Sequence, residues 1–180
     1  MHRFTLAIAI ALCATLSASA SRQAPGQDAT LASIRSAHEV AKGYVTKALA
    51  MIPQDKLGYQ PTKEVRTMGQ LFGHVANASG MICGMASGTK MASSGDAEKL
   101  TTKADLQKAL EASLAFCDKA FASITTTNAN EAVELFGMKH TRIGAMAFNN
   151  AHNFEHYGNI VTYMRINGMV PPSSGGGGEN

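Results

Sequence analysis

The chain has 180 residues, a formal net charge of +3, and 16 lysines and arginines that are scattered along the sequence. Because no run or face concentrates this positive charge, the composition argues against nucleic-acid binding, and we expect no nucleic-acid partner. A chain of this length is suited to one domain with a substantial core.

The first 20 residues have the order of a secretory signal peptide. His2 and Arg3 precede an apolar run at 4–16, and the small residues 18–20 follow it. The run is too short to span a bilayer, which needs about 20 residues, so we expect cleavage after Ala20. We therefore predict a periplasmic or secreted protein with no membrane segment after cleavage.

A domain is expected over 30–172, after a flexible N-terminal segment at 21–29. Thr30 can cap the first helix, and prolines 53 and 61 bracket the loop after it, because proline cannot continue a helix. Apolar positions with the helical period run along this helix and include one histidine: Ile34, His38, Ala41, Val45, Ala48 and Ile52.

Capping-box patterns mark the starts of the second and third helices. "TMGQ" at 67–70 and "TKAD" at 102–105 each place a polar side chain three residues after a threonine cap. The third helix is expected to end at about 125. The segment 87–101, rich in Ser, Gly and Thr, is then a long connection between the two helices.

A fourth helix is expected from Thr141 to Asn167, with Gly168 as its stop signal. No segment alternates with a period of two and β-branched enrichment, so we expect no sheet. The expected fold class is therefore all-α: a four-helix bundle with a long crossover between helices 2 and 3, followed by a flexible Gly-rich tail at 173–180.

The fourth helix is apolar on two opposite faces. Phe154 shares one face with the small residues Ala147, Ala151 and Gly158, and the opposite face also carries apolar side chains. One face can look into the bundle, but the other needs a second partner, and small residues let another helix approach closely. We predict a homodimer through helix 4.

Two cysteines, Cys83 and Cys117, remain after signal cleavage. An oxidising compartment would allow them to pair. However, Cys117 falls on the apolar stripe of its helix, whereas Cys83 lies to one side of its own. Because the geometry of a disulfide is narrow, we expect two buried free thiols, with a disulfide as the alternative.

Histidines form the candidate metal site. His152 and His156 lie one turn apart on one helical face, which suits two ligands of one ion, although two interior histidines with ordinary partners would share this spacing. His74, one turn into the second helix, can supply a third neutral nitrogen. Three ligands with an open position are typical of catalytic sites. We expect His38 to orient a ligand or to pack in the core, rather than to be a fourth ligand, and His140 to be solvated.

Two segments resemble the DinB-like family of metal-dependent bundles: "TMGQLFGHVAN" at 67–77 and "HNFEHYGNIVTYMRINGMVPPSS" at 152–174. The family pattern has one histidine early in helix 2, H-x-x-x-H in helix 4, and a helix that ends before Pro-Pro. The resemblance implies a four-helix bundle with a long crossover, usually a dimer. It also implies a nickel, zinc or iron ion held by His74, His152 and His156.

The resemblance covers nearly all of the chain after the signal segment, about 30–172. Some relatives are thiol-dependent transferases or isomerases in which the metal activates a low-molecular-weight thiol, and most have no known reaction. This chain departs from them in two ways. It is predicted to be exported, and low-molecular-weight thiols are scarce outside the cytoplasm. It also has no tryptophan, whereas many relatives carry aromatic residues around the site.

"HNFEH" also fits H-x-x-E-H, the inverted zinc-peptidase signature, with Glu155 as general base. That signature needs a further acidic ligand downstream, and the sole acid after His156 is Glu179 in the tail. Glu155 can still serve as a base beside the metal, or it is solvated or paired with an arginine. Two classes of function follow: a metal-dependent hydrolase or transferase of unknown substrate, or a non-catalytic metal- or ligand-binding bundle.

Overall fold

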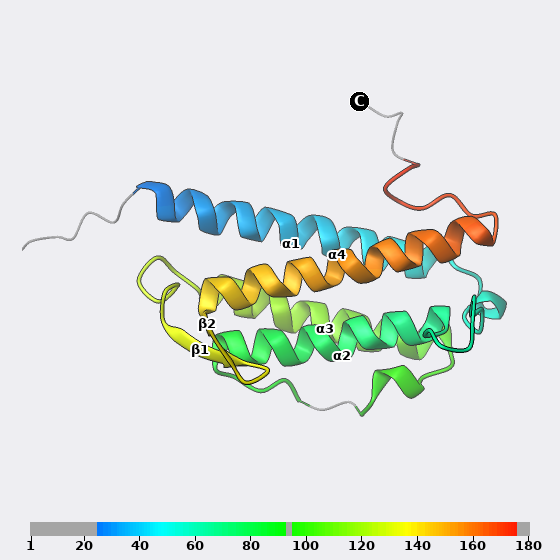
Figure 1. Cartoon of the computed structure of the whole chain (residues 1–180), viewed down its shortest axis with the longest axis horizontal. Coiled ribbons are helices and arrows are strands. Elements are labelled where there is room, and N and C mark those ends of the chain that lie inside the picture. The colour runs from blue at the N-terminus through cyan, green and yellow to red at the C-terminus, as the bar shows by residue number, and fades with distance from the viewer. Residues whose placement is uncertain (1–24, 93–94, 176–180) are drawn as a thin grey trace, which may run out of the picture.

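The computed structural model describes residues 25–92 and 95–175. The chain forms four long helices that lie side by side (Figure 1), which confirms the all-α bundle and the long crossover between the second and third helices. These helices are α1 (Pro25–Met51), α2 (Met68–Ser87), α3 (Lys103–Ser123) and α4 (Arg142–Ile166). The predicted signal peptide lies outside the described residues. Within them, no helix has the length and hydropathy needed to cross a membrane.

Threonine caps begin three of the helices. Thr67 Oγ1 accepts a hydrogen bond from the backbone N–H of Gln70 (3.2 Å), and Gln70 Oε1 accepts one from the N–H of Thr67 (2.9 Å), which confirms the capping box of α2. Thr102 and Thr141 cap α3 and α4 through their side-chain oxygens. Such a cap stabilises a helix by about 1 kcal/mol.

The predicted start of α1 is wrong. This helix begins at Pro25, and Thr30 lies inside it, where its hydroxyl donates a hydrogen bond to the carbonyl of Gly26 (2.9 Å). Proline is favoured in the first turn of a helix, because backbone N–H groups there have no acceptor within the helix and the lack of one costs nothing. A threonine that bonds back along its own helix is indistinguishable in sequence from one that caps it.

The expectation of no sheet is also wrong, because a hairpin precedes α4. Strands β1 (Ala132–Leu135) and β2 (Met138–Thr141) pair antiparallel, with Val133 opposite His140. Phe136 and Gly137 both have positive φ (53° and 76°), as a two-residue primed turn requires. Strands of four residues are too short to show alternation.

Cys83 and Cys117 form a disulfide between α2 and α3, with their Cα atoms 5.3 Å apart, so the expectation of free thiols is wrong. Both residues are buried. The position of Cys83 beside the apolar stripe of α2 turns it toward α3 rather than away from the core. A helical stripe shows which face is covered, but not which helix covers it.

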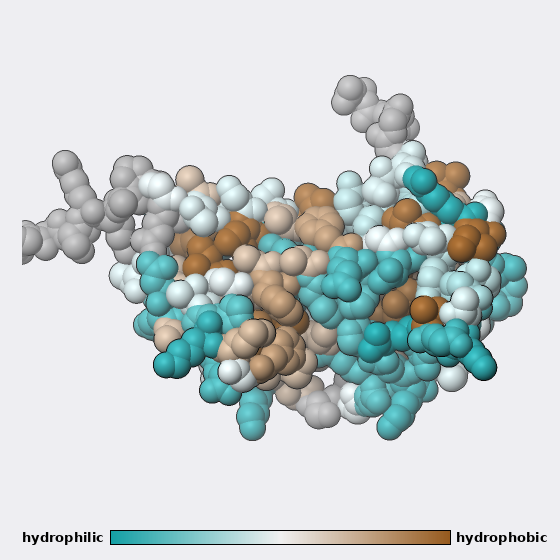
Figure 2. Space-filling view, in the orientation of Figure 1, coloured by the Kyte–Doolittle hydropathy of each residue, from teal (hydrophilic) through white to brown (hydrophobic). Residues whose placement is uncertain are grey.

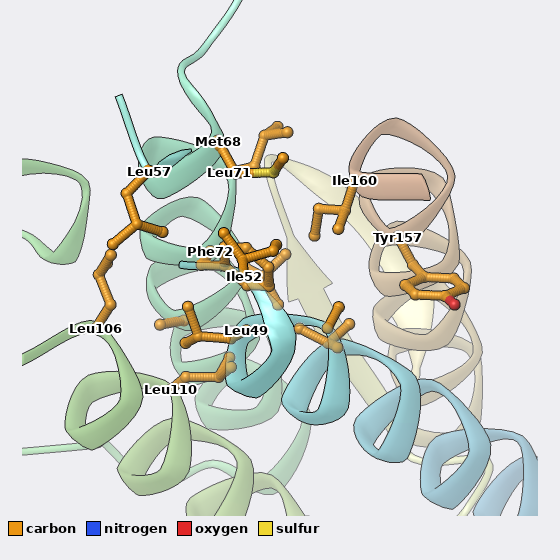
Figure 3. Close-up of a cluster of buried hydrophobic side chains, with 14 of the residues drawn as sticks. Leu49, Ile52, Leu57, Met68, Leu71, Phe72, Leu106, Leu110, Tyr157 and Ile160 are labelled. Carbon is orange, nitrogen blue, oxygen red and sulfur yellow. The ribbon is translucent and has the colours of Figure 1, made fainter. Parts of the chain in front are cut away.

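One end of the bundle is filled by large apolar side chains from all four helices (Figure 3), among them Leu49, Phe72, Leu110 and Ile160. Burial of each such side chain stabilises the fold by about 1.5–3 kcal/mol. This packing fixes α2 against α4, and it therefore fixes the helices that carry the candidate ligands.

The outer face of α4 is exposed in the described chain. Ala147, Ala151 and Gly158 are open to solvent, and Phe154 is 38% exposed. Figure 2 shows apolar patches between α1 and α4 on this side of the molecule. The exposed Val40 of α1 lines one shallow hollow together with Phe154.

Candidate metal centre

Three imidazole rings converge between α2 and α4. His74 lies in the second turn of α2, and His152 and His156 lie one turn apart on α4. The Nε2 atom of His152 is 3.2 Å from Nε2 of His74 and 3.1 Å from Nε2 of His156. One nitrogen from each ring falls within a group of potential ligand atoms that all lie within 4.8 Å of one another. The structure thus brings together the three histidines of the predicted triad.

These separations fit a shared metal ion. Two nitrogens bound to one ion at about 2.0–2.1 Å lie about 2.9 Å apart at a right angle and about 3.3 Å apart at a tetrahedral angle. Both measured separations fall within this interval. A donor set of neutral imidazoles suits zinc, nickel or iron.

Burial keeps the histidines of α4 neutral. Burial first, and then the neighbouring rings of His152 and His74, lower the pKa of His156 to about 4. The pKa of His152 is also lowered, first by burial and then by His74. Neutral imidazoles have the lone pair that a metal ligand needs, so both rings are ready to bind at neutral pH.

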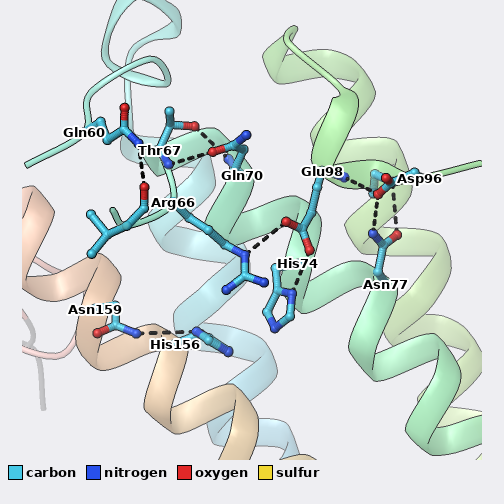
Figure 4. A network of polar contacts seen from close by, with 12 residues as sticks. Gln60, Arg66, Thr67, Gln70, His74, Asn77, Asp96, Glu98, His156 and Asn159 are labelled. Atoms are coloured by element: carbon cyan, nitrogen blue, oxygen red, sulfur yellow. Dashed lines mark hydrogen bonds and ion pairs between the residues drawn. The ribbon is translucent and has the colours of Figure 1, made fainter. Parts of the chain in front are cut away.

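Glu98 orients the ring of His74 (Figure 4). Its Oε1 accepts a hydrogen bond from His74 Nδ1 (2.7 Å), and its Oε2 accepts one from Arg66 Nε (3.0 Å). Burial raises the pKa of Glu98, but the contacts with Arg66 and His74 outweigh it, so the net shift is downward and the group is a carboxylate. Because Nδ1 carries the proton in this bond, the lone pair of His74 is on Nε2, which faces the other two rings.

The turn η2 (Ala97–Lys99) brings Glu98 to the site by packing directly on α2. A Cβ atom on Gly73 would lie 2.3 Å from the carbonyl oxygen of Ala97, so only glycine permits this approach. Asn77 holds the same turn: its amide nitrogen donates to Asp96 (2.7 Å), and its amide oxygen accepts from the N–H of Ala97 (3.0 Å). Sequence reasoning missed Glu98, because it lies in a connection without periodicity.

On α4, the ring partners are less complete. His156 Nδ1 lies 3.4 Å from Nδ2 of Asn159. A ring that binds metal through Nε2 has its proton on Nδ1 and needs an acceptor there, which the oxygen of the same amide would supply if the amide were turned over. His152 Nδ1 is buried without a hydrogen-bond partner among the described residues. Beside it, Ser79 of α2 donates to Asn153 of α4 (3.0 Å), which adds a polar contact between the two helices.

Comparison with known proteins identifies the family. The sequence pattern of the DinB superfamily matches residues 37–160, more than half of the chain. The chain belongs to the DinB superfamily. This confirms the resemblance that the two histidine-containing segments indicated.

Two solved structures share the fold of this DinB superfamily member. A DinB-like protein from Bacillus cereus is 17% identical and aligns with a TM-score of 0.64 over 73% of this chain and 89% of its own. A DinB-like protein from Bacillus subtilis is also 17% identical, with a TM-score of 0.59 over 77% and 93% of the two chains. Likeness at this identity concerns the fold alone. Among curated proteins, none matches.

The remaining histidines of this DinB superfamily member lie elsewhere. His38 is buried in a separate group, where its Nε2 bonds to Asp118 (2.8 Å) and its ring stacks on Phe121 (4.1 Å between centroids). Of the two expected roles, His38 therefore has the one of a packed core residue, because it does not contact the triad. His140 is half-buried on β2, with its ring 6.4 Å from that of Phe148, so the expectation of a solvated side chain is wrong.

A polar hollow of about 750 Å³ adjoins the triad of this DinB-like bundle. His156, Glu98 and Arg66 line it together with Glu155, which is exposed at its edge. An apolar hollow of about 510 Å³ lies on α2 beside residues 88–92 and 95–97, and no histidine of the triad lines it. The polar hollow is therefore the one from which a small molecule would reach a bound ion.

Proposed function

We propose that this DinB superfamily member is a metal-dependent hydrolase or transferase that acts on a small molecule. The observation that carries the proposal is the convergence of three imidazoles next to a polar hollow. Three protein ligands leave a position for water or substrate, whereas structural zinc sites are closed by four. A zinc, nickel or iron ion held there would act as a Lewis acid.

The side chains around the triad would have separate tasks. Glu98 keeps the proton of His74 on Nδ1 through its 2.7 Å bond, so that Nε2 remains free to bind. Glu155, exposed at the rim of the hollow, is the candidate general base. An H-x-x-E-H peptidase needs an acidic third ligand beside its histidine pair. Here the third potential ligand beside His152 and His156 is His74, which favours the present proposal.

The test begins with elemental analysis of protein purified without an affinity tag. We expect about one equivalent of a transition metal per chain in the parent, and a sharp loss in His156→Ala with helical content unchanged. His140→Ala is the matched control, because His140 is a half-buried histidine that lies outside the triad. Equal metal content in the parent and His156→Ala would reject the site.

Turnover separates an enzyme from a non-catalytic binder. A panel of activated esters and group-transfer substrates, assayed with and without chelator, should give turnover that the chelator abolishes. Metal-loaded protein that turns over none of these substrates would favour the metal-binding bundle instead.

Export and dimerisation are further parts of the proposal. The Cys83–Cys117 disulfide supports export, because such bonds persist in oxidising compartments. N-terminal sequencing of protein from the periplasm or medium should begin at residue 21. The exposed small residues of α4 support a homodimer, and Ala151→Glu should convert it to a monomer in sedimentation experiments.

A further inference from the structure

The hollow beside the triad has the size and lining of a small-molecule site. Its volume of about 750 Å³ lies within the range of ordinary ligand pockets. Its walls are mostly polar, with contributions from Lys63, Arg66, Gln70, Asn159 and Tyr163. A ligand held there must therefore offer polar groups of its own.

Arg66 occupies the side of this hollow nearest the triad. Its Nε donates to Glu98, whose other oxygen bonds to His74, so one carboxylate joins the guanidinium to the triad. Figure 4 shows the terminal guanidinium nitrogens directed toward the space between His74 and His156.

The terminal guanidinium nitrogens of Arg66 are available to bind a ligand. A guanidinium has five N–H donors, and the ion pair with Glu98 uses the one on Nε. Among the described residues, the terminal nitrogens have no protein partner, and the side chain is 41% exposed. A planar fork of this kind matches the two oxygens of a carboxylate.

The charge of a loaded site also favours an anion. The charges of Glu98 and Arg66 cancel, and three imidazole ligands bring no negative charge to offset that of a divalent ion. Lys63 adds a positive charge on the wall of the hollow, whereas Glu64 and Glu155 on the same wall are negative. A bound divalent ion would therefore make the net charge of the hollow positive.

We propose that Arg66 is a specificity-determining residue of this site, and that the substrate is a small organic molecule bearing a carboxylate. This inference rests on the proposed metal-dependent function. The guanidinium fork holds the carboxylate, and the reacting group of the same molecule reaches the triad, a few covalent bonds away. Arg66 thus has two roles: it fixes Glu98 through Nε and binds substrate through its terminal nitrogens.

Matched hydroxamates test this inference, since a hydroxamate binds a metal ion and can carry a second group. The probes are acetohydroxamate, which has no carboxylate, and the monohydroxamates of malonic, succinic and glutaric acid. Calorimetry on zinc-loaded parent protein should show at least one carboxylate probe binding about 10- to 100-fold more tightly than acetohydroxamate. Arg66→Gln should abolish this preference, and Arg66→Lys should retain part of it.

Lys63→Gln is the matched control, because it removes the other cation of the same hollow. We expect the preference to survive in it, and an equal loss in Lys63→Gln and Arg66→Gln would overturn the assignment to Arg66. No preference in zinc-loaded parent would overturn the inference while leaving the metal site intact. A parent that binds no zinc would reject the proposed function, and the inference with it.

Elemental analysis and thermal unfolding of each variant separate binding from positioning. If Arg66 only positions Glu98, Arg66→Gln lowers the metal content but keeps the carboxylate preference of the fraction that remains loaded, and this result would overturn the inference. We expect the opposite: a lost preference, with metal still bound at saturating zinc and an unchanged fold.

Discussion

Gly73→Ala should disturb the candidate metal centre without touching any of its histidines. The added Cβ would lie 2.3 Å from the carbonyl oxygen of Ala97 and 2.7 Å from the Cα of Glu98, whereas ordinary contacts are 3.4–4 Å. Both neighbours are backbone atoms, so the turn η2 must move by about 1 Å. A shift of that size would lengthen the 2.7 Å bond between Glu98 and His74 to about 3.7 Å, beyond hydrogen-bonding distance.

Two magnitudes follow from this displacement. Overpacking of this kind lowers the free energy of unfolding by about 1–3 kcal/mol, measured by urea denaturation of the metal-free protein. Loss of the bond that orients a histidine ligand weakens metal binding about 10- to 100-fold, measured by competition with a chromogenic chelator.

Gly43→Ala is the matched control for Gly73→Ala. Gly43 also lies inside a helix, but nothing surrounds the position of its missing Cβ within 4 Å. Alanine there should raise stability by about 0.5–1 kcal/mol and leave metal affinity unchanged. If Gly73→Ala behaved like this control, the close approach of η2 to α2 would not be what positions Glu98.

Three further perturbations have defined outcomes. Glu98→Gln should weaken metal binding about 10- to 100-fold with little change in helical content, and unchanged affinity would show that the Glu98–His74 bond does not matter. Reduction of the Cys83–Cys117 disulfide, which closes 34 residues, should lower the free energy of unfolding in urea by about 3–4 kcal/mol, and a negligible change would contradict this entropic estimate. Burial and then the neighbouring imidazoles hold the pKa of His156 at about 4 in the fold, against 6.5 in the unfolded chain. The unfolded chain therefore gains its proton first as the pH falls from about 6.5 to about 4, and the metal-free protein should lose up to roughly 3 kcal/mol of stability over that window. Urea unfolding across this pH range measures the loss, and a flat profile would show that burial does not perturb His156.

The helices and the triad could be predicted from sequence because their signals are local. The caps at Thr67, Thr102 and Thr141 form hydrogen bonds within three residues of themselves, so a short window contains both partners. His152 and His156 are likewise neighbours on one helix. The approach of His74 depends on which helices pack together; the rule that bundles build metal sites from facing helices predicted it, and the family resemblance agreed.

The features that were missed depend on contacts between distant residues. Glu98 is placed by Gly73 and Asn77, which lie more than 20 residues earlier, and nothing in its own segment marks it. The disulfide depends on the side of α2 that faces α3. The hairpin before α4 depends on positive φ at Phe136, a conformation that few aromatic residues adopt.

Helix α2 has one covalent cross-link, and the proposed metal ion would add a second of different chemistry. The disulfide ties it covalently to α3, and the histidine triad would tie it to α4 through an exchangeable ion. Removing that ion would leave the covalent link and the apolar core in place, so the metal-free protein would keep its fold and could bind a metal ion again. A scarce metal could thus be withdrawn and returned many times without a new round of folding.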